Sequence, residues 1–155
     1  MKIINGKLLA EDLNKKLTND IKAFKSKFNK IPHLVVILVG ENPASQVYVR
    51  NKEKKAIEVG IKSTITKLEK DITEKKLLGV IEEYNQDITV DGILVQLPLP
   101  NHINSNKVID KIALEKDVDG FNSKNIGLLA LGRPKVVPCT PLGCYKMLEN
   151  IIKLD

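Results

Sequence analysis

Hydrophobic residues along the chain follow two spacings, one typical of helices and one typical of buried strands. The first set recurs every three or four residues, as one face of an amphipathic helix requires: Leu13, Leu17, Ile21, Phe24 and Phe28. This helix should end near Pro32, which cannot continue it. The continuous apolar run from Leu34 to Val39, stopped by Gly40, predicts a strand that is covered on both faces.

The same pattern continues as an alternation of helices and strands. Spacing and cap residues predict a helix from Asn42-Pro43 to about Val59, a strand from Lys62 to Leu68, a helix from Thr73 to about Asn85, a strand from Ile93 to Leu97, and a short helix that Ser105 caps and that runs through Val108 and Ile112. Elements of this length and order predict an α/β fold. We expect a three-layer domain in which a mostly parallel sheet is flanked by helices on both faces.

The last third of the chain has a different pattern. Residues 120–138 carry few periodic apolar positions and several glycines and prolines, so this segment should be mostly irregular. Thr140-Pro141 is then a strong helix start, with a capping hydroxyl followed by proline in the first turn. That helix should run nearly to the last residue and carries a rich apolar set: Leu142, Tyr145, Met147, Leu148, Ile151 and Ile152. A helix this apolar must pack on this domain or on a following one.

Composition narrows the possible functions. The 155 residues suit one domain with a sizeable core. The net charge of +6 comes almost entirely from lysine, since Arg50 and Arg133 are the only arginines, and aromatic residues make up 4% of the chain. Because nucleic-acid binding relies on arginine forks and aromatic stacking, we expect no nucleic-acid partner. The positive field would attract an anionic small molecule, or it serves only to keep the protein soluble.

Cysteine usage and hydropathy indicate the compartment. Cys139 and Cys144 are the only cysteines and do not form a CxxC pair, which argues against a zinc site and favours a reducing cytoplasm. The N-terminus lacks the apolar stretch of a secretory signal, and no apolar run reaches membrane-spanning length. We therefore expect a cytoplasmic protein without a membrane partner.

The most informative segment is VDGILVQLPLP, residues 90–100. A proline has no backbone N–H, so the sheet cannot continue through Pro98 and Pro100. Gln96 is therefore left at the carboxyl end of a buried strand, beside a stiff Leu-Pro-Leu-Pro wall. That edge is where open α/β sheets bind ligands, and a glutamine amide there can both donate and accept hydrogen bonds.

Tyr48 and Lys52 are four residues apart, so they share one face of the second helix. The preceding sequence ENPASQ places them in the first turns, near the positive end of the helix dipole, which disfavours an ammonium group. A lysine in that setting can carry protons near neutral pH. The alternative is a solvated lysine, like most lysines of this chain.

The segment KDVDGF, residues 116–121, supplies two carboxylates. Asp117 and Asp119 flank a valine, so an extended backbone puts them on one face, and Gly120 permits a tight turn after them. One of these aspartates, held near an aromatic heterocycle, has the chemistry to accept two N–H bonds from an amino-imine edge. The alternatives are an ordinary turn with solvated acids and a DxD metal site, for which no further ligand cluster is present.

The remaining reactive side chains have simpler interpretations. His33 and His102 have no partners of a catalytic triad in the sequence, so we expect structural or surface roles. Cys139 precedes a helix start that would lower the pKa of a thiol, but a buried cysteine that shapes the backbone is the preferred interpretation.

Four segments, in this order and spacing, carry a resemblance to a known family: ENPASQVYVRNK, VDGILVQLPLP, KDVDGFN and PCTPLG. Together they resemble the bifunctional methylenetetrahydrofolate dehydrogenase/methenyltetrahydrofolate cyclohydrolase family, called FolD in bacteria. The resemblance covers the whole chain. It implies an aminoacid dehydrogenase-like N-terminal domain that acts in one-carbon folate metabolism. The family oxidises 5,10-methylene-tetrahydrofolate to the methenyl form with NADP and hydrolyses that product to 10-formyl-tetrahydrofolate.

The resemblance also implies site roles. Lys52 would be the general acid/base, and Gln96 would hold and tune it. Tyr48 would stack on the aminobenzoate ring and orient Lys52, which makes it the third catalytic residue. Asp119 would bind the pterin edge, and Pro98 and Leu99 would wall the folate pocket. In addition, Pro141 and Gly143 would lie at the domain junction. A neutral lysine suits a cationic methenyl carbon, and a positive field suits the glutamate tail of folate.

The chain departs from the family in lacking a glycine-rich NADP loop. We expect residues 1–119 to form the catalytic domain and residues 120–155 to form a connecting loop and helix toward a Rossmann domain that is absent from this chain. On that basis this piece should be inactive or weakly active alone, and a homodimer is implied. The alternatives are a folate-binding module without catalysis and a basic nucleic-acid-binding protein.

Overall fold

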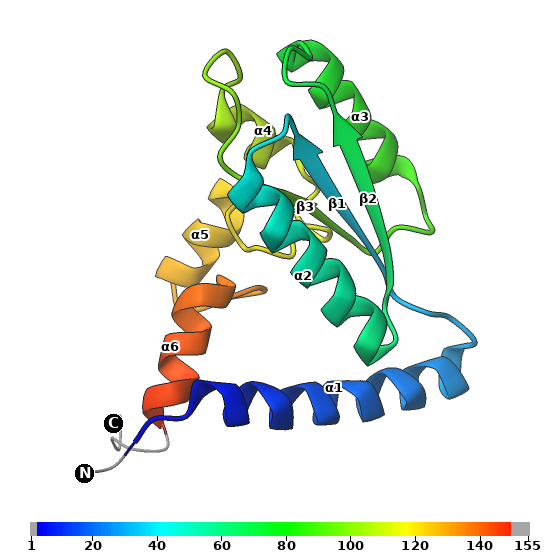
Figure 1. Cartoon of the computed structure of the whole chain (residues 1–155), viewed down its shortest axis with the longest axis vertical. Helices are drawn as coiled ribbons and strands as arrows, with labels where there is room; N and C mark the ends of the chain where they lie inside the picture. Colours follow the sequence, from blue (N-terminus) through cyan, green and yellow to red (C-terminus); the bar gives the residue numbers. More distant parts are fainter. Residues whose placement is uncertain (1–2, 150–155) are drawn as a thin grey trace.

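The computed structural model describes residues 3–149, in which helices and strands alternate along most of the chain (Figure 1). The elements in order are α1 (Gly6–Phe28), β1 (His33–Val39), α2 (Pro43–Val59), β2 (Lys62–Leu68), α3 (Glu74–Gln86), β3 (Gly92–Val95), α4 (Ser105–Lys111), α5 (Ser123–Ala130) and α6 (Cys139–Glu149). The predicted α/β class is confirmed. None of the helices described is long and apolar enough to cross a membrane.

The three strands form one parallel sheet in the order β2-β1-β3. The central strand β1 is buried at every position except Leu34, as its continuous apolar run predicts. It pairs with β2 as far as Val39↔Leu68 and with β3 as far as Ile37↔Val95. Because all three strands are parallel, their carboxyl ends meet at one edge of the sheet.

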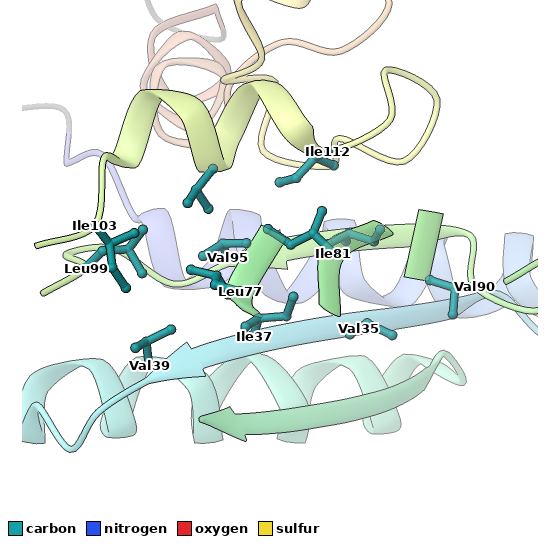
Figure 2. Close-up of a cluster of buried hydrophobic side chains, with 12 residues drawn as sticks. Val35, Ile37, Val39, Leu77, Ile81, Val90, Val95, Leu99, Ile103 and Ile112 are labelled. Carbon is teal, nitrogen blue, oxygen red and sulfur yellow. The ribbon is translucent and has the colours of Figure 1, made fainter. Parts of the chain in front are cut away.

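Helices cover both faces of this sheet, so the predicted three layers are confirmed (Figure 1). One face packs against α3 and α4 and holds the larger core cluster, shown in Figure 2: Val35, Ile37, Val39, Leu77, Ile81, Val90, Ile93, Val95, Leu99, Ile103, Val108 and Ile112. The other face packs against α2 through Val36, Leu38, Leu94 and Val49. Alternate residues of β1 thus point to opposite layers, and both layers hold the same strand in place.

The first helix differs from the prediction in its packing. Its end at Phe28, with Asn29 as the cap, agrees with the expected stop before Pro32. However, no residue of α1 is buried, and Leu13 and Phe28 remain 47% and 56% exposed. The helix lies outside the sheet layers: it crosses the C-terminal end of α2, and its own N-terminal end lies beside α6 (Figure 1). Its apolar face is therefore only partly covered within residues 3–149.

The predicted boundaries of α2 and α3 are confirmed by their caps. The Asn42 side chain accepts a hydrogen bond from the Ser45 backbone N–H at 3.0 Å. The helix α2 ends at Gly60, whose φ of 94° lies in the left-handed region that glycine tolerates. The Thr73 hydroxyl accepts from the Lys76 N–H at the start of α3.

Two predicted helix caps in the second half of the chain were wrong, and one short helix was not predicted. Asn104, not Ser105, caps α4, because an Asn side chain one residue earlier already accepts from the Lys107 N–H. The segment 120–138 is mostly irregular, as predicted, but it contains the eight-residue helix α5, capped by Asn122, which the pattern did not predict. The helix α6 already begins at Cys139, so Thr140 lies inside the helix and does not cap it. The predicted helical positions Ile151 and Ile152 lie outside the described residues.

Candidate functional site

Gln96 lies where its strand leaves the sheet. Its backbone N–H makes a final ladder hydrogen bond to the Ile37 carbonyl at 2.8 Å, and β3 has already ended at Val95. The chain then passes through a cis Leu97-Pro98 peptide bond. The side-chain NH₂ of Gln96 donates to the Leu97 carbonyl at 2.7 Å. Because that bond occupies the NH₂ end, the amide oxygen points away from the backbone.

This amide oxygen faces Lys52. The Lys52 Nζ donates a hydrogen bond to Gln96 Oε1 over 3.2 Å, which joins two residues 44 positions apart. Lys52 is half-buried because α2 packs on the sheet through its neighbours Val49 and Ala56. The two side chains that the sequence singled out separately therefore meet at the carboxyl edge of the sheet, where ligands bind in open α/β folds.

The expected influence of the helix dipole on Lys52 was wrong. The helix α2 begins at Pro43, so Lys52 is its tenth residue and lies in the third turn. The field of a helix end falls off within the first turn, and it therefore does not act on this ammonium group. Partial burial and the partner Gln96 define the surroundings of Lys52.

Asp119 lies in electrostatic range of Lys52. Burial of its carboxyl group is the main cause that raises its pKa, and the like charge of Asp117 adds to the effect. The Lys52 ammonium opposes both by lowering the pKa of Asp119. The half-buried Asp119 and the half-buried Lys52 thus lie near each other. This is expected of residues that bind a polar ligand.

Cys139, the first residue of α6, lies near Asp119 and Lys52. Its Sγ lies 3.9 Å from the Val118 carbonyl oxygen. The residue is exposed, so the expectation of a buried cysteine was wrong. Desolvation of the thiol and the negative charge of Asp119 raise the pKa of Cys139, against the lowering by Lys52. Burial and the charge of Asp119 therefore oppose any activation of this thiol by the helix start.

Tyr48 and the proline wall complete the neighbourhood. Tyr48 lies one turn before Lys52 on α2, and its side chain is 63% exposed and free to stack on a ligand. Pro98 and Leu99 line a hollow of about 460 Å³ at the same edge, together with Val39, Gly40, Glu41, Asn42, Lys70 and Pro100. Lys52, Gln96 and Asp119 do not line this hollow.

The two α6 residues linked to a domain junction, Pro141 and Gly143, are both exposed. Gly143 lines an apolar groove of about 420 Å³ between α1 and α6. The sulfur of Met147, in the same groove, lies only 3.1 Å from where a Cβ on Gly6 would stand, so the two helices approach closely there.

The histidines have the structural roles expected. His33 is buried, with Nδ1 3.1 Å from the Thr89 carbonyl and Nε2 2.8 Å from the Thr64 hydroxyl. His102 contacts the Ile72 carbonyl at the surface. Within residues 3–149 no cluster of three or more His, Cys, Asp or Glu side chains could hold a metal ion.

Sequence reasoning missed the role of two residues near the site. Asp117 is buried, and it is neither a solvated turn acid nor a partner of Asp119 on one exposed face. Its carboxyl group accepts hydrogen bonds from the loop that follows and from Asn125, which is also fully buried. The available signal was the asparagine pair in FNSKN, whose side chains suit caps and turns.

Comparison with known proteins gives the family. The model of the tetrahydrofolate dehydrogenase/cyclohydrolase catalytic domain matches residues 4–119. The bifunctional protein FolD of Pelagibacter ubique is 51% identical over 151 residues, which cover 97% of this chain and 54% of that protein. FolD of Streptococcus mutans is 54% identical over 147 residues, which cover 95% of this chain and 52% of that protein. The chain spans about half the length of the curated relatives it matches.

Solved structures agree. The FolD enzyme of Campylobacter jejuni superposes with a TM-score of 0.94 at 45% identity and covers 97% of this chain and 53% of its own. The Trypanosoma brucei methylenetetrahydrofolate dehydrogenase-cyclohydrolase, solved with NADP cofactor and an inhibitor, superposes with a TM-score of 0.92 at 31% identity. It covers 96% of this chain and 51% of its own. The chain therefore belongs to the tetrahydrofolate dehydrogenase/cyclohydrolase family, and its fold is that of the N-terminal domain of these enzymes.

Proposed function

We propose that this chain supplies the folate-binding catalytic half of a bifunctional enzyme of one-carbon metabolism. The whole enzyme would oxidise 5,10-methylene-tetrahydrofolate to the methenyl form with NADP and hydrolyse it to 10-formyl-tetrahydrofolate. The observation that carries the proposal is the hydrogen bond of Lys52 to Gln96 in a chain of this family. An orientable lysine at the carboxyl edge of the sheet is what both half-reactions need.

In the hydrolytic step, water attacks the cationic methenyl carbon, the bond from that carbon to N5 breaks, and one proton is released overall. Lys52, as a neutral amine, would take the proton from the attacking water and then return it to the leaving nitrogen. Gln96 would hold the amine in place through its Oε1, since its NH₂ group is already bonded to the Leu97 carbonyl. A neutral lysine does not repel a cationic carbon, whereas an ammonium would.

The remaining predicted residues would bind the substrate. Asp119 is half-buried and lies within electrostatic range of Lys52. It would accept N–H bonds from the amino-pyrimidine edge of the pterin. The exposed Tyr48 ring would stack on the aminobenzoate ring, and Pro98 and Leu99 would wall the pocket. The net charge of +6 would favour the anionic glutamate tail.

NADP does not fit the residues at hand. Residues 3–149 hold no glycine-rich phosphate loop, and the N-terminus of α2, which follows Gly40, is closed by the Asn42 side chain. We propose residues 1–119 as the catalytic domain, in agreement with the family match, and residues 120–155 as a connection toward a nucleotide-binding domain. A cytoplasmic homodimer completes the proposal.

Substitution of Lys52 by alanine tests the function. We expect the chain to accelerate the loss of methenyl-tetrahydrofolate absorbance weakly over buffer, since the nucleotide-binding domain that we propose would supply further walls of the site. Lys52→Ala should abolish the acceleration while folate binding is largely kept. The matched control is Lys55→Ala on the same helix, whose exposed side chain pairs with Glu58.

Three outcomes separate the alternatives. Folate binding with no acceleration in the parent chain would indicate a binding module without catalysis. Equal acceleration by Lys52→Ala and the parent would contradict the role of Lys52. Salt-sensitive binding of nucleic acid with no affinity for folate would overturn the proposal altogether.

A further inference from the structure

A buried carboxyl group organises the loop that carries Asp119. Asp117 is 2% exposed, and its Oδ1 accepts a hydrogen bond from the Gly120 N–H at 3.0 Å. Its Oδ2 accepts from the Asn122 N–H at 2.9 Å and from the Asn125 side-chain NH₂ at 2.7 Å. Three donors thus converge on one side chain, and all of them belong to the chain that follows Asp119.

The same loop is fixed to the sheet before the turn begins. The Ile93 N–H donates to the Lys116 carbonyl at 2.8 Å, so Asp117 continues beside β3 as a parallel bridge. Val118 packs against Gly92, where a Cβ would lie 2.5 Å from its Cγ1. Residues 116–118 are therefore fixed beside β3. The hydrogen bonds that Asp117 accepts fix the backbone immediately after Asp119.

Asn125 links this loop to α5. It is fully buried, its NH₂ group donates to Asp117, and its Oδ1 has no hydrogen-bond partner within the described part of the chain. A buried amide with one unsatisfied end is costly, so its remaining bond must offset that cost. Among the described residues, the side chain of Asn125 makes one hydrogen bond, the bond to Asp117. This bond therefore links α5 to the loop.

We propose that Asp117 and Asn125 form a positioning pair that fixes the Asp119 carboxylate beside Lys52. Neither member needs to touch the ligand, since both act through the backbone of residues 117–122. As far as folate affinity is concerned, the inference rests on the proposed role of Asp119 in binding the pterin. The geometric part, the placement of Asp119, stands apart from that role and can be measured without ligand.

The test uses Asn125→Ala, which removes the donor but leaves every charge in place. The groups around Asp119 that titrate or carry charge are Lys52 of α2, Asp117 of its own segment and Cys139 of α6. The carboxyl carbon of Asp119 is followed by ¹³C NMR through a pH titration of the ligand-free chain. If the loop loosens, Asp119 gains solvent and its raised pKa falls toward the ordinary value. Tetrahydrofolate affinity should also fall, by roughly tenfold, as for the loss of one buried hydrogen bond.

Two further variants make the result unambiguous. Ile81→Val, which trims the core on the α3 side, should lower the melting temperature without moving the titration of Asp119. Asn125→Ser, with a polar side chain one bond shorter, is the milder substitution if the alanine variant does not fold. An unchanged Asp119 titration in the folded Asn125 variant overturns the inference, whatever the affinity. A shifted titration in a chain that never binds tetrahydrofolate supports the positioning pair and contradicts only the proposed function.

Discussion

At the scale of single residues, the Gln96 amide is oriented by its own backbone. Its NH₂ group is committed to the Leu97 carbonyl at 2.7 Å, so its oxygen is the end that remains for Lys52. This arrangement gives the lysine an acceptor without a negative charge, which a carboxylate in the same place would bring. A neutral acceptor orients an amine without favouring its protonated form as strongly as an anion would.

Replacement of Gln96 by leucine tests this orientation. The variant keeps the side-chain volume but leaves Lys52 without its acceptor, so the proposed acceleration of cyclohydrolysis should fall to near the buffer rate, because acid–base catalysis contributes about a hundredfold or more. The measurement is the rate of methenyl-tetrahydrofolate loss beside a thermal melt. Gln86→Leu is the control, because Gln86 is exposed and donates only to Glu82 at the surface. A melting temperature that falls in step with the rate would assign Gln96 to folding alone.

At the scale of elements, β3 and the segment that follows α4 are in closer contact than side chains normally allow. Gly92 stands where any Cβ would meet the Val118 Cγ1 at 2.5 Å. The strand therefore requires glycine at this position for close approach and not for an unusual backbone angle. The contact lies one residue before Asp119, so packing in the sheet affects the candidate site directly.

A pair of glycine substitutions measures this contact. Gly92→Ala should destabilise the fold by about 1–3 kcal/mol through overpacking, and Val118→Ala in the same chain should restore part of the loss. Gly79→Ala is the control, since nothing lies within 4 Å of its would-be Cβ in α3, and it should stabilise by up to about 1 kcal/mol. Urea unfolding gives all four free energies. A Gly92 variant as stable as the parent would contradict the close contact.

Elements with strong periodicity could be predicted from sequence, and elements set by local side chains could not. The run from Leu34 to Val39 is buried on both faces and leaves no alternative to a central strand. In contrast, α5 has only eight residues, and Gly127 is one of them. A helix this short gives little apolar periodicity, and the glycine argues against a helix, so the sequence did not predict it. It forms because Asn122 caps it and Asn125 bonds to Asp117, a contact that no spacing reveals.

The candidate site shows the same division. Lys52, Gln96 and Asp119 were found from their residue types and from a family resemblance, and the structure places them around one edge of the sheet. The depth of Lys52 within α2 was misjudged, because the helix starts at Pro43 and carries the lysine into its third turn. Whether a charged side chain such as Asp117 is buried depends on tertiary contacts, which the local sequence does not contain.

At the scale of the whole molecule, burial is concentrated in the sheet and absent from the first helix. The central strand β1 is held on both faces and both edges, whereas α1 has no buried residue. Local stability follows the density of buried contacts, so the two elements should open with very different free energies.

Hydrogen exchange measures this difference. Backbone amides of β1 should exchange only through global unfolding, and those in the middle of α1 should exchange faster by several orders of magnitude. The experiment is native-state exchange followed by NMR, with the α3 residues around Leu77 as an internal reference for a buried helix. Equal protection of α1 and β1 would show that the apolar face of α1 is covered in solution.

The 44-residue separation between Lys52 and Gln96 also has a consequence for folding. The lysine comes from a crossover helix, the glutamine from the end of a later parallel strand, and Asp119 from a loop still further along the chain. Contacts of such high sequence separation form late, after the loops between them have been closed. Tetrahydrofolate affinity would therefore be a property of the complete domain and of none of its parts. A folate analogue added during refolding would report the final step of assembly.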